Sequence, residues 1–235
     1  MRCVRTSFVF ICLFLTANYA QEIPKNSYGL AVVSDSALFQ KQIEKDSSKQ
    51  LVDLEKFIPG LFIEVRYASE NNFAKTKFYE SEKVFLRFPA AVALKKIQKE
   101  LALQNISLKI FDAYRPYSVT KKMWKFVHDA RYAADPKKGS RHNRACAVDV
   151  TLVDLKTKTE LEMPTPYDDF TVKAHHSYSN LPRKVLKNRE LLKTIMTKYG
   201  FETITSEWWH YDFSGWKNFE LLDIPFEELE KHRIY

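Results

Sequence analysis

Two short stretches of the chain carry side chains that could together bind a metal ion and activate a water molecule. The first contains His142 seven residues before Asp149, and the second contains Glu207 three residues before His210. Catalytic zinc usually takes three protein ligands and leaves a fourth position for water. His142, Asp149 and His210 form such a set, and Glu207 remains to act as the general base that takes a proton from that water.

A predicted β-strand positions Asp149. The apolar run 150–153 follows it, and short apolar runs rich in β-branched residues favour buried strands. Side chains alternate along a strand, so Asp149 lies on the face opposite Val148 and Val150. The aliphatic face can pack on a core, which turns the carboxylate toward an opening. A charge at the edge of a core is costly unless it is paired or binds a metal, so we expect a cation beside Asp149.

The second stretch is predicted to be extended rather than helical. Its neighbourhood is rich in β-branched and aromatic residues, which favour strands: Ile204, Thr205, Trp208, Trp209, Tyr211 and Phe213. It therefore differs from the helical H-E-x-x-H of common zinc proteases, in which two histidines lie one turn apart. We expect His210 inside a strand and Glu207 at its entrance.

These stretches, with three others, resemble a known family. The pattern S-x-H-x-x-x-x-A-x-D, followed by E-x-W-H, resembles the zinc D,D-peptidases related to the hedgehog fold, and more closely the VanX-type D-alanyl-D-alanine dipeptidases. The likeness covers most of the chain between about residues 65 and 213. It continues, in the family's order, in three further stretches: Val65-Arg-Tyr-Ala-Ser-Glu-Asn-Asn-Phe73, Phe111-Asp-Ala-Tyr-Arg-Pro116 and Met163-Pro-Thr-Pro-Tyr-Asp168.

The resemblance implies roles for residues outside the ligand set. Arg115 would stabilise the oxyanion that forms when water attacks an amide, and Asp112 or a neighbouring carboxylate would orient it. Asp168 and Tyr67 would bind the ammonium end of a dipeptide, and Ser140 its carboxylate. A closed amine end would exclude longer peptides, because an acylated nitrogen leaves a buried carboxylate unpaired.

Each of these residues also has an ordinary structural interpretation. Arg115 and Asp112 could form a surface ion pair, and Tyr67 could be a core residue. Asp168 could form an Asx-turn and Ser140 could cap the backbone. A single histidine or aspartate of the ligand set would likewise be read as structural, and the combination of all of them with a glutamate at the family spacing is what favours a metal site.

Several neighbouring residues bear on this interpretation. Ala145 and Pro164 stand where the family commonly has glycine. If the first position needs a positive φ, alanine there costs strain, and Pro164 lies in the loop that carries the residue predicted to bind the amine. Cys146 shares the parity of the core-facing strand residues and is expected to be a small buried hydrophobe. His175 and His176 could line the pocket, but a structural or supporting role is our expectation for both.

The first twenty residues have the pattern of a cleavable secretory signal. Arg2 and Arg5 precede an apolar run at 8–15, and a small residue, Ala20, ends the segment. The run is too short to span a bilayer comfortably. We therefore expect a periplasmic or secreted protein with no stable membrane insertion after cleavage, the alternative being an uncleaved anchor.

Composition narrows the function further. Removal of the signal would lower the formal net charge from +8 to +6 and leave Cys146 as the only thiol. One cysteine cannot form an internal disulfide, so the fold relies on its core and on its metal. No basic run is dense enough to suggest nucleic-acid binding. The family resemblance implies a small zwitterionic dipeptide as the partner. Oligomeric state does not follow from the composition.

The pattern of elements predicts an α+β fold in a single domain. Residues 1–20 are the expected signal peptide, residues 21–50 a polar, aperiodic N-terminal arm, and residues 51–235 the zinc dipeptidase domain, which can bury one sizeable core. Helices and short strands mix without a regular βαβ repeat. The resemblance implies a small, mainly antiparallel sheet with flanking helices.

Individual elements follow from periodicity and capping. Apolar residues at helical spacing predict a helix over about 90–101, and a strand follows at 108–111. A second helix is expected from an N-cap at Ser118 to about residue 130, and a third from about residue 182 to a stop at Gly200. The segment 57–68 is expected to be an early strand or extended chain. A further strand is expected to begin at Asp149.

The sequence is best interpreted as a zinc dipeptidase, with one zinc ion per chain, that hydrolyses D-alanyl-D-alanine with metal-activated water and Glu207 as base. Two alternatives remain. One is a D,D-carboxypeptidase or L,D-peptidase that acts on peptidoglycan stem peptides. The other is a non-catalytic, zinc-containing hedgehog-like binding domain, against which the presence of both Glu207 and Arg115 speaks.

Overall fold

The computed structural model describes residues 22–232, so the predicted signal segment at residues 1–20 lies outside the described residues. The fold is α+β, as predicted. The helices are α1 (Ser36–Lys45), α2 (Leu54–Phe57), α3 (Phe88–Ala102), α4 (Tyr117–Val127), α5 (Arg183–Lys198) and α6 (Phe226–His232). The strands are β1 (Val32–Val33), β2 (Leu51–Asp53), β3 (Phe62–Ile63), β4 (Phe85–Arg87), β5 (Ile106–Asp112), β6 (Ala147–Asp154), β7 (Phe201–Thr203), β8 (His210–Phe213) and β9 (Leu221–Leu222).

A five-stranded sheet in the order β3-β5-β6-β8-β7 forms the centre of the molecule. The β3–β5 pair is parallel and the other pairs are antiparallel, which confirms the expected mainly antiparallel sheet. Two small sheets flank it: β2 pairs with β4 antiparallel, and β1 pairs with β9 parallel.

Strand β6 is the buried strand that the apolar run predicted. Val148, Val150 and Leu152 are completely buried, and Asp149 on the opposite face is only 3% exposed. In the sheet, Asp149 lies opposite Asp112 of β5 on one side and opposite His210 of β8 on the other. The sheet therefore aligns three of the predicted site residues in one row. A register shift in β5 just before Asp112 marks an irregularity of the kind that re-aims side chains near functional sites.

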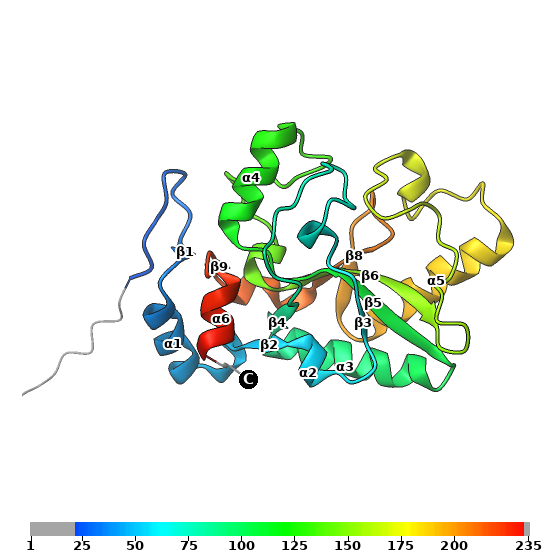
Figure 1. Cartoon of the computed structure of the whole chain (residues 1–235), viewed down its shortest axis with the longest axis horizontal. Coiled ribbons are helices and arrows are strands. Elements are labelled where there is room, and N and C mark those ends of the chain that lie inside the picture. Colours follow the sequence, from blue (N-terminus) through cyan, green and yellow to red (C-terminus); the bar gives the residue numbers. More distant parts are fainter. Residues whose placement is uncertain (1–21, 233–235) are drawn as a thin grey trace, which may run out of the picture.

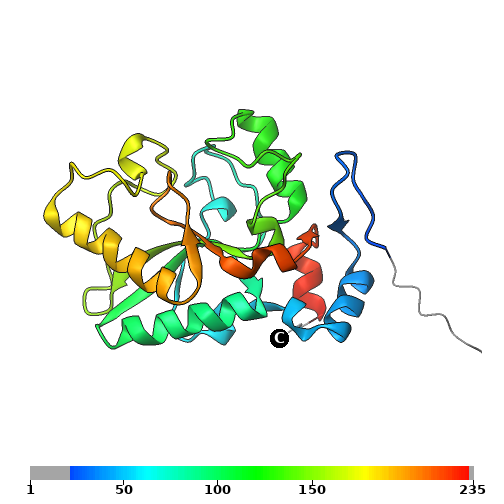
Figure 2. The same ribbon diagram turned by 180° about the vertical axis from the view of Figure 1, so that it is seen from behind.

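Helices α3 and α5 pack along the sheet and contact each other (Figure 2). Helix α3 matches the predicted apolar stripe, because Ala90, Leu94, Ile97 and Leu101 are all completely buried. Helix α5 ends at Lys198, one residue before the expected end, and is capped by Tyr199. Gly200 follows, as expected, with a φ of +85°, a conformation that residues other than glycine rarely adopt.

Helix α4 and two long loops, at about 66–84 and 163–180, rise on the opposite side of the sheet from α3 (Figure 1). The predicted N-cap of α4 is wrong: the helix begins at Tyr117, so Ser118 is already inside its first turn. The backbone N–H of Ser118 donates to Oδ1 of Asp223 at 2.8 Å. The helix ends at Val127, three residues before the expected end, and the residue that caps it, His128, has a left-handed φ of 49°.

The predicted N-terminal arm contains a helix that its polar composition hid. Asp35 caps α1 by accepting from the backbone N–H of Leu38, and Leu38 and Phe39 are the buried residues of the helix. With so few apolar anchors, the segment lacks the strong periodicity that identifies a helix. Strand β1 then pairs with β9, so two strands from opposite ends of the sequence lie side by side (Figure 1).

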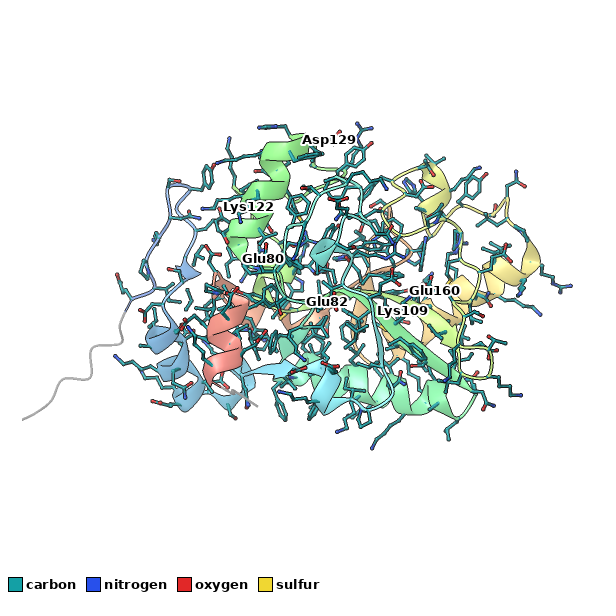
Figure 3. All side chains as sticks on the ribbon, viewed as in Figure 1. Glu80, Glu82, Lys109, Lys122, Asp129 and Glu160 are labelled. Atoms are coloured by element: carbon teal, nitrogen blue, oxygen red, sulfur yellow. The ribbon has the colours of Figure 1, made fainter. Side chains whose placement is uncertain are left out.

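The expected extended segment 57–68 is more broken than predicted. It contains the end of α2, the two-residue strand β3, and a 3₁₀ turn at Arg66–Ala68 that carries Tyr67. Lys109 of β5 forms ion pairs with Glu64, just after β3, and with Glu160, the latter at 2.8 Å (Figure 3). These pairs tie the edge of the sheet together near solvent, where each is worth about 0–1 kcal/mol. Between residues 22 and 232, no helix combines the length and apolar character needed to cross a bilayer.

Candidate active site

The three predicted metal ligands lie together. Asp149 comes from β6, His210 is the first residue of β8, and His142 begins a 3₁₀ turn at His142–Arg144. Their donor atoms lie within 4.8 Å of one another, and within residues 22–232 no other His, Cys, Asp or Glu group with this spacing is found. The exposed fractions are 3% for His142, 3% for Asp149 and 8% for His210.

The spacing and chemistry of these atoms fit zinc. Nδ1 of His210 is 3.0 Å from Oδ1 of Asp149 and 3.2 Å from Nε2 of His142. Nε2 of His142 is 3.5 Å from the same Oδ1. Ligands about 2.0–2.2 Å from an ion at tetrahedral angles lie about 3.4 Å from one another. Two imidazole nitrogens and one carboxylate oxygen are also a donor set that suits zinc.

Neighbouring groups orient all three predicted ligands. Nδ1 of His142 is 2.7 Å from the carbonyl oxygen of Ala113, to which it must donate, so its Nε2 faces the site. The Tyr167 hydroxyl donates to Oδ2 of Asp149 at 2.9 Å. Nε2 of His210 is 2.9 Å from Oδ1 of Asp212. Reasoning from the sequence missed Tyr167 and Asp212 as site residues.

The electrostatics of the site favour positive charge. Burial alone would raise the pKa of Asp149, but the charges and hydrogen bonds of His142 and His210 lower it well below its usual range. Burial would also lower the pKa of His210, yet Asp149 and Asp212 hold it well above its usual value. The surroundings of Asp149 thus favour a cation there, which is what the sequence predicted.

Glu207 and Arg115 border the same cavity as the ligands. Its volume is about 280 Å³, small for a ligand pocket, and its walls also include Tyr67, Ser140 and Asp168. Glu207 lies in the turn before β8, as expected, and burial raises its pKa to about 7.

Arg115 and Asp112 form a buried pair rather than a surface pair. Nη2 and Nε of Arg115 donate to Oδ2 of Asp112 at 2.6 and 3.1 Å. The other oxygen of Asp112 accepts from the Tyr79 hydroxyl at 2.9 Å. Arg115 is 6% exposed and Asp112 is 1% exposed. Asp112 therefore stands behind Arg115 and orients it, and it is not itself part of the cavity wall.

Asp168 and Tyr67 contact each other at the edge of the cavity. The Tyr67 hydroxyl donates to one oxygen of Asp168 at 3.1 Å, and the backbone N–H of Phe73 donates to the other, also at 3.1 Å. Burial raises the pKa of Asp168 to about 7. The guanidinium of Arg115 lies 5.0 Å from the centre of the Tyr67 ring. This wall of the cavity thus holds a carboxylate that a cationic group would stabilise.

Ser140 has the structural role that was considered as its alternative. Its Oγ accepts from the backbone N–H of His142 at 3.1 Å, and its own N–H donates to Asn143 at 2.9 Å. Ser140 still borders the cavity, and accepting this bond leaves its hydroxyl hydrogen available to a second partner. Ala145, which follows this turn, has a φ of 54° and is an alanine in the left-handed region, as the family glycine suggested.

Four further residues discussed in the sequence analysis lie outside the cavity wall: Cys146, Pro164, His175 and His176. Burial raises the pKa of the Cys146 thiol to about 12, so it is a neutral buried group, as expected. The ring of His176 packs against that of Tyr211, with 6.4 Å between the ring centres. Burial lowers the pKa of His176 to about 4. The carbonyl of His175 accepts from Arg189 at 3.0 Å. Pro164 borders a second, separate cavity.

Comparisons with known proteins show the family to which the chain belongs. A family model described as D-ala-D-ala dipeptidase matches residues 47–230. A D-alanyl-D-alanine dipeptidase of Escherichia coli (strain K12) is 35% identical over 177 residues, covering 75% of this chain and 91% of that protein. A D-alanyl-D-alanine dipeptidase of Enterococcus faecalis (strain ATCC 700802 / V583) is 26% identical over 201 residues, covering 74% of this chain and 93% of that protein.

One solved structure, the vancomycin resistance D,D-dipeptidase VanXYg in complex with a D-Ala-D-Ala phosphinate analogue, has a TM-score of 0.35 and 17% identity, and covers 70% of this chain and 66% of that chain. The family assignment rests on the sequence comparisons, because the family model spans well over half of the chain and the E. coli relative covers three quarters of it. The chain belongs to the D-Ala-D-Ala dipeptidase family of peptidases.

Proposed function

We propose that this protein is an exported zinc dipeptidase that hydrolyses D-alanyl-D-alanine. One observation carries the proposal: three donor atoms lie within 4.8 Å of one another in the wall of a small cavity that Glu207 and Arg115 also border. A metal site alone would fit a binding domain. A buried carboxylate and a buried guanidinium beside it are the additional groups that amide hydrolysis needs. The relatives named D-alanyl-D-alanine dipeptidases support the choice of substrate.

The zinc ion would be held by Nε2 of His142, Oδ1 of Asp149 and Nδ1 of His210, the three atoms that face one another. When bound, zinc would polarise the amide carbonyl and lower the pKa of water toward about 7. His142 and Asp149 are held in place by Ala113 and Tyr167, so the donor set is largely preorganised.

Glu207 would move the proton. It is a carboxylate whose burial raises the pKa to about 7, so it can accept a proton from the attacking water and return it to the leaving amine near neutral pH. Arg115 would stabilise the negative charge that develops on the carbonyl oxygen. Its two hydrogen bonds to Asp112 keep the guanidinium in place, which avoids reorganisation during the reaction.

The ends of the substrate would be bound separately. Asp168, with Tyr67 beside it, would pair with the ammonium group, and the charge of that group would favour the ionised form of Asp168. The Ser140 hydroxyl would donate to the substrate carboxylate. The cavity of about 280 Å³ suits a small dipeptide, and an acylated amine would leave Asp168 without its cationic partner.

Export is proposed from the sequence of residues 1–20, which has the charged start and short apolar run of a secretory signal. The enzyme would then act in the periplasm or outside the cell. Fractionation of cells that express the full chain tests this: we expect the processed protein outside the cytoplasm, and an unprocessed cytoplasmic protein would contradict export without affecting the proposed chemistry.

The substrate is tested by comparing free D-alanyl-D-alanine with its N-acetylated form. Purified protein loaded with zinc should release D-alanine from the free dipeptide and hydrolyse the acetylated form far more slowly. A preference for the acetylated form would favour a carboxypeptidase that acts on stem peptides. No turnover of either compound with zinc fully bound would favour a binding domain.

A further inference from the structure

We propose that Asp212 is a positioning residue that selects which nitrogen of His210 faces the metal. This inference rests on the proposed zinc site. Asp212 would act through His210 and would not itself contact the substrate. Asp212 was not among the site residues expected from the sequence. It follows His210 by two residues in β8, so both side chains lie on the same face of the strand.

The contacts of the His210 ring are divided between its two nitrogens. Nε2 is 2.9 Å from Oδ1 of Asp212. Nδ1 is 3.0 Å from Oδ1 of Asp149 and 3.2 Å from Nε2 of His142. A neutral imidazole carries hydrogen on one nitrogen and a lone pair on the other, and an ionised carboxylate can only accept. If Nε2 donates to Asp212, Nδ1 presents its lone pair to the donor set.

Asp149 would select the opposite tautomer if it acted alone. Its Oδ1 is close enough to Nδ1 to accept a hydrogen bond, and a hydrogen there would occupy the position that the metal needs. Asp212 supplies a competing acceptor at the other nitrogen. Its carboxylate is therefore required because a second carboxylate already lies on the metal side of the ring.

The other histidine ligand shows the contrast. His142 is held at Nδ1 by the neutral carbonyl of Ala113, 2.7 Å away, and presents Nε2. His210 is held at Nε2 by a carboxylate and presents Nδ1. The two rings thus bind through different nitrogens, and in each the nitrogen that faces away from the site has a dedicated acceptor. Such partners orient metal ligands and raise their basicity.

Asp212 is itself held firmly. Asp212 is 4% exposed. Its partners in the sheet are Ala147 of β6 on one side and Glu202 of β7 on the other. Its second oxygen, Oδ2, is 3.4 Å from Nε of Arg141, whose guanidinium lies 4.7 Å from the centre of the Trp216 ring. The carboxylate is thus fixed by the sheet and has a cationic neighbour, so it can determine the orientation of the imidazole.

The test compares the zinc affinity of the mature chain, residues 21–235, with that of D212A, D212N and a control, E202A. Glu202 lies directly opposite Asp212 in the sheet, but its side chain is exposed, so E202A removes a nearby negative charge without touching His210. Competition with a chromophoric chelator at fixed pH gives the dissociation constants. We expect a loss of about 10–100-fold for D212A, a loss of about tenfold for D212N, and no change for E202A.

Nitrogen NMR of the labelled His210 ring supplies a readout that general loss of structure would not imitate. In zinc-loaded wild-type protein, Nε2 should carry hydrogen and Nδ1 should not. In metal-free D212A near pH 9, hydrogen should move to Nδ1, facing Asp149. Should D212A fail to fold, the zinc affinity of D212N tests the positioning role of Asp212, and circular dichroism checks that D212N is folded.

Zinc binding by the wild type and by the variants distinguishes an error in the proposed function from an error in the role of Asp212. If the wild-type chain binds no zinc, the proposed function is wrong. If the wild type binds zinc and a folded D212A or D212N binds it equally well, only the positioning role is overturned. A loss of equal size in E202A would also overturn it, because general electrostatics would then explain the effect.

Discussion

Asp149 and His210 lie directly opposite each other on β6 and β8, with Oδ1 of one 3.0 Å from Nδ1 of the other. On the other side of β6, Asp112 lies opposite Asp149. Two of the three proposed metal ligands and the residue that orients Arg115 are therefore in one row across three strands. A slip of one residue in either pairing would turn the partner side chains to the other face, so the register of the sheet and the chemistry of the site depend on each other.

Replacement of Glu207 by Gln should remove turnover while leaving the metal site intact. The amide cannot accept the proton of the attacking water, so kcat should fall by about 10²–10⁴-fold. Zinc content and melting temperature should stay close to those of the wild type, because Glu207 is not in the ligand set. Steady-state kinetics with metal analysis checks this, and full activity in the variant would refute the role of Glu207 as base.

Removal of zinc should lower stability without unfolding the protein. In the metal-free chain the imidazolium of His210 still pairs with Asp149, so the site keeps a compensating positive charge. Zinc at 100 times its dissociation constant should stabilise the fold by about 2.7 kcal/mol. Thermal denaturation with and without chelator, followed by addition of zinc, measures the effect. An Asp149→Ala variant should lose the response to zinc, and a wild-type chain whose melting temperature does not respond would contradict the site.

Replacement of Arg115 by Ala should damage both stability and catalysis. It leaves the buried carboxylate of Asp112 without its partner, which costs about 3–5 kcal/mol. Loss of the oxyanion contact should also lower kcat by about 10²–10³-fold. Chemical denaturation and kinetics measure the two effects separately.

A double variant separates the structural part from the catalytic part. Arg115→Met combined with Asp112→Asn removes both buried charges and should recover much of the stability but none of the activity. Recovery of activity in the double variant would show that the Arg115 guanidinium does not stabilise the transition state.

Asp168→Asn should change how stability depends on pH. The pKa of Asp168 is raised to about 7 in the fold, against about 4 in an unfolded chain. The unfolded state therefore loses its proton first, and this group lowers the stability of the wild type as pH rises from about 4 to about 7. The metal-free Asn variant lacks this effect, so its stability relative to the wild type should improve by about 2–4 kcal/mol between pH 4 and pH 8.

Thermal or chemical denaturation of both proteins across this pH range gives the difference. The same variant should bind the free dipeptide more weakly, because the ammonium group loses its anionic partner. A stability difference that is constant with pH would mean that Asp168 is ionised without penalty in the fold.

Periodicity was sufficient for the elements that carry a clear apolar pattern. The stripe that contains Leu94 and Ile97 predicted α3, and the run after Asp149 predicted β6 and the face on which the carboxylate lies. Local signals failed where tertiary contacts compete with them. Ser118 has the residue type of an N-cap, but Asp223, distant in the sequence, satisfies its backbone N–H. Helix α1 has only two buried residues, Leu38 and Phe39, and is stabilised by the hydrophobic core against which they pack.

The sequence by itself determined which donor types the site contains and that Asp149 faces away from the aliphatic core, because residue identity and the alternation of side chains along a strand are local properties. It also contained a usable signal for Asp212, two residues after His210 on the same face of a strand. Only the tertiary structure decided that Ala113, Tyr167 and Asp212 form hydrogen bonds with His142, Asp149 and His210. Which strands pair and in what register depends on contacts between distant segments, and those contacts leave no periodic trace in the chain.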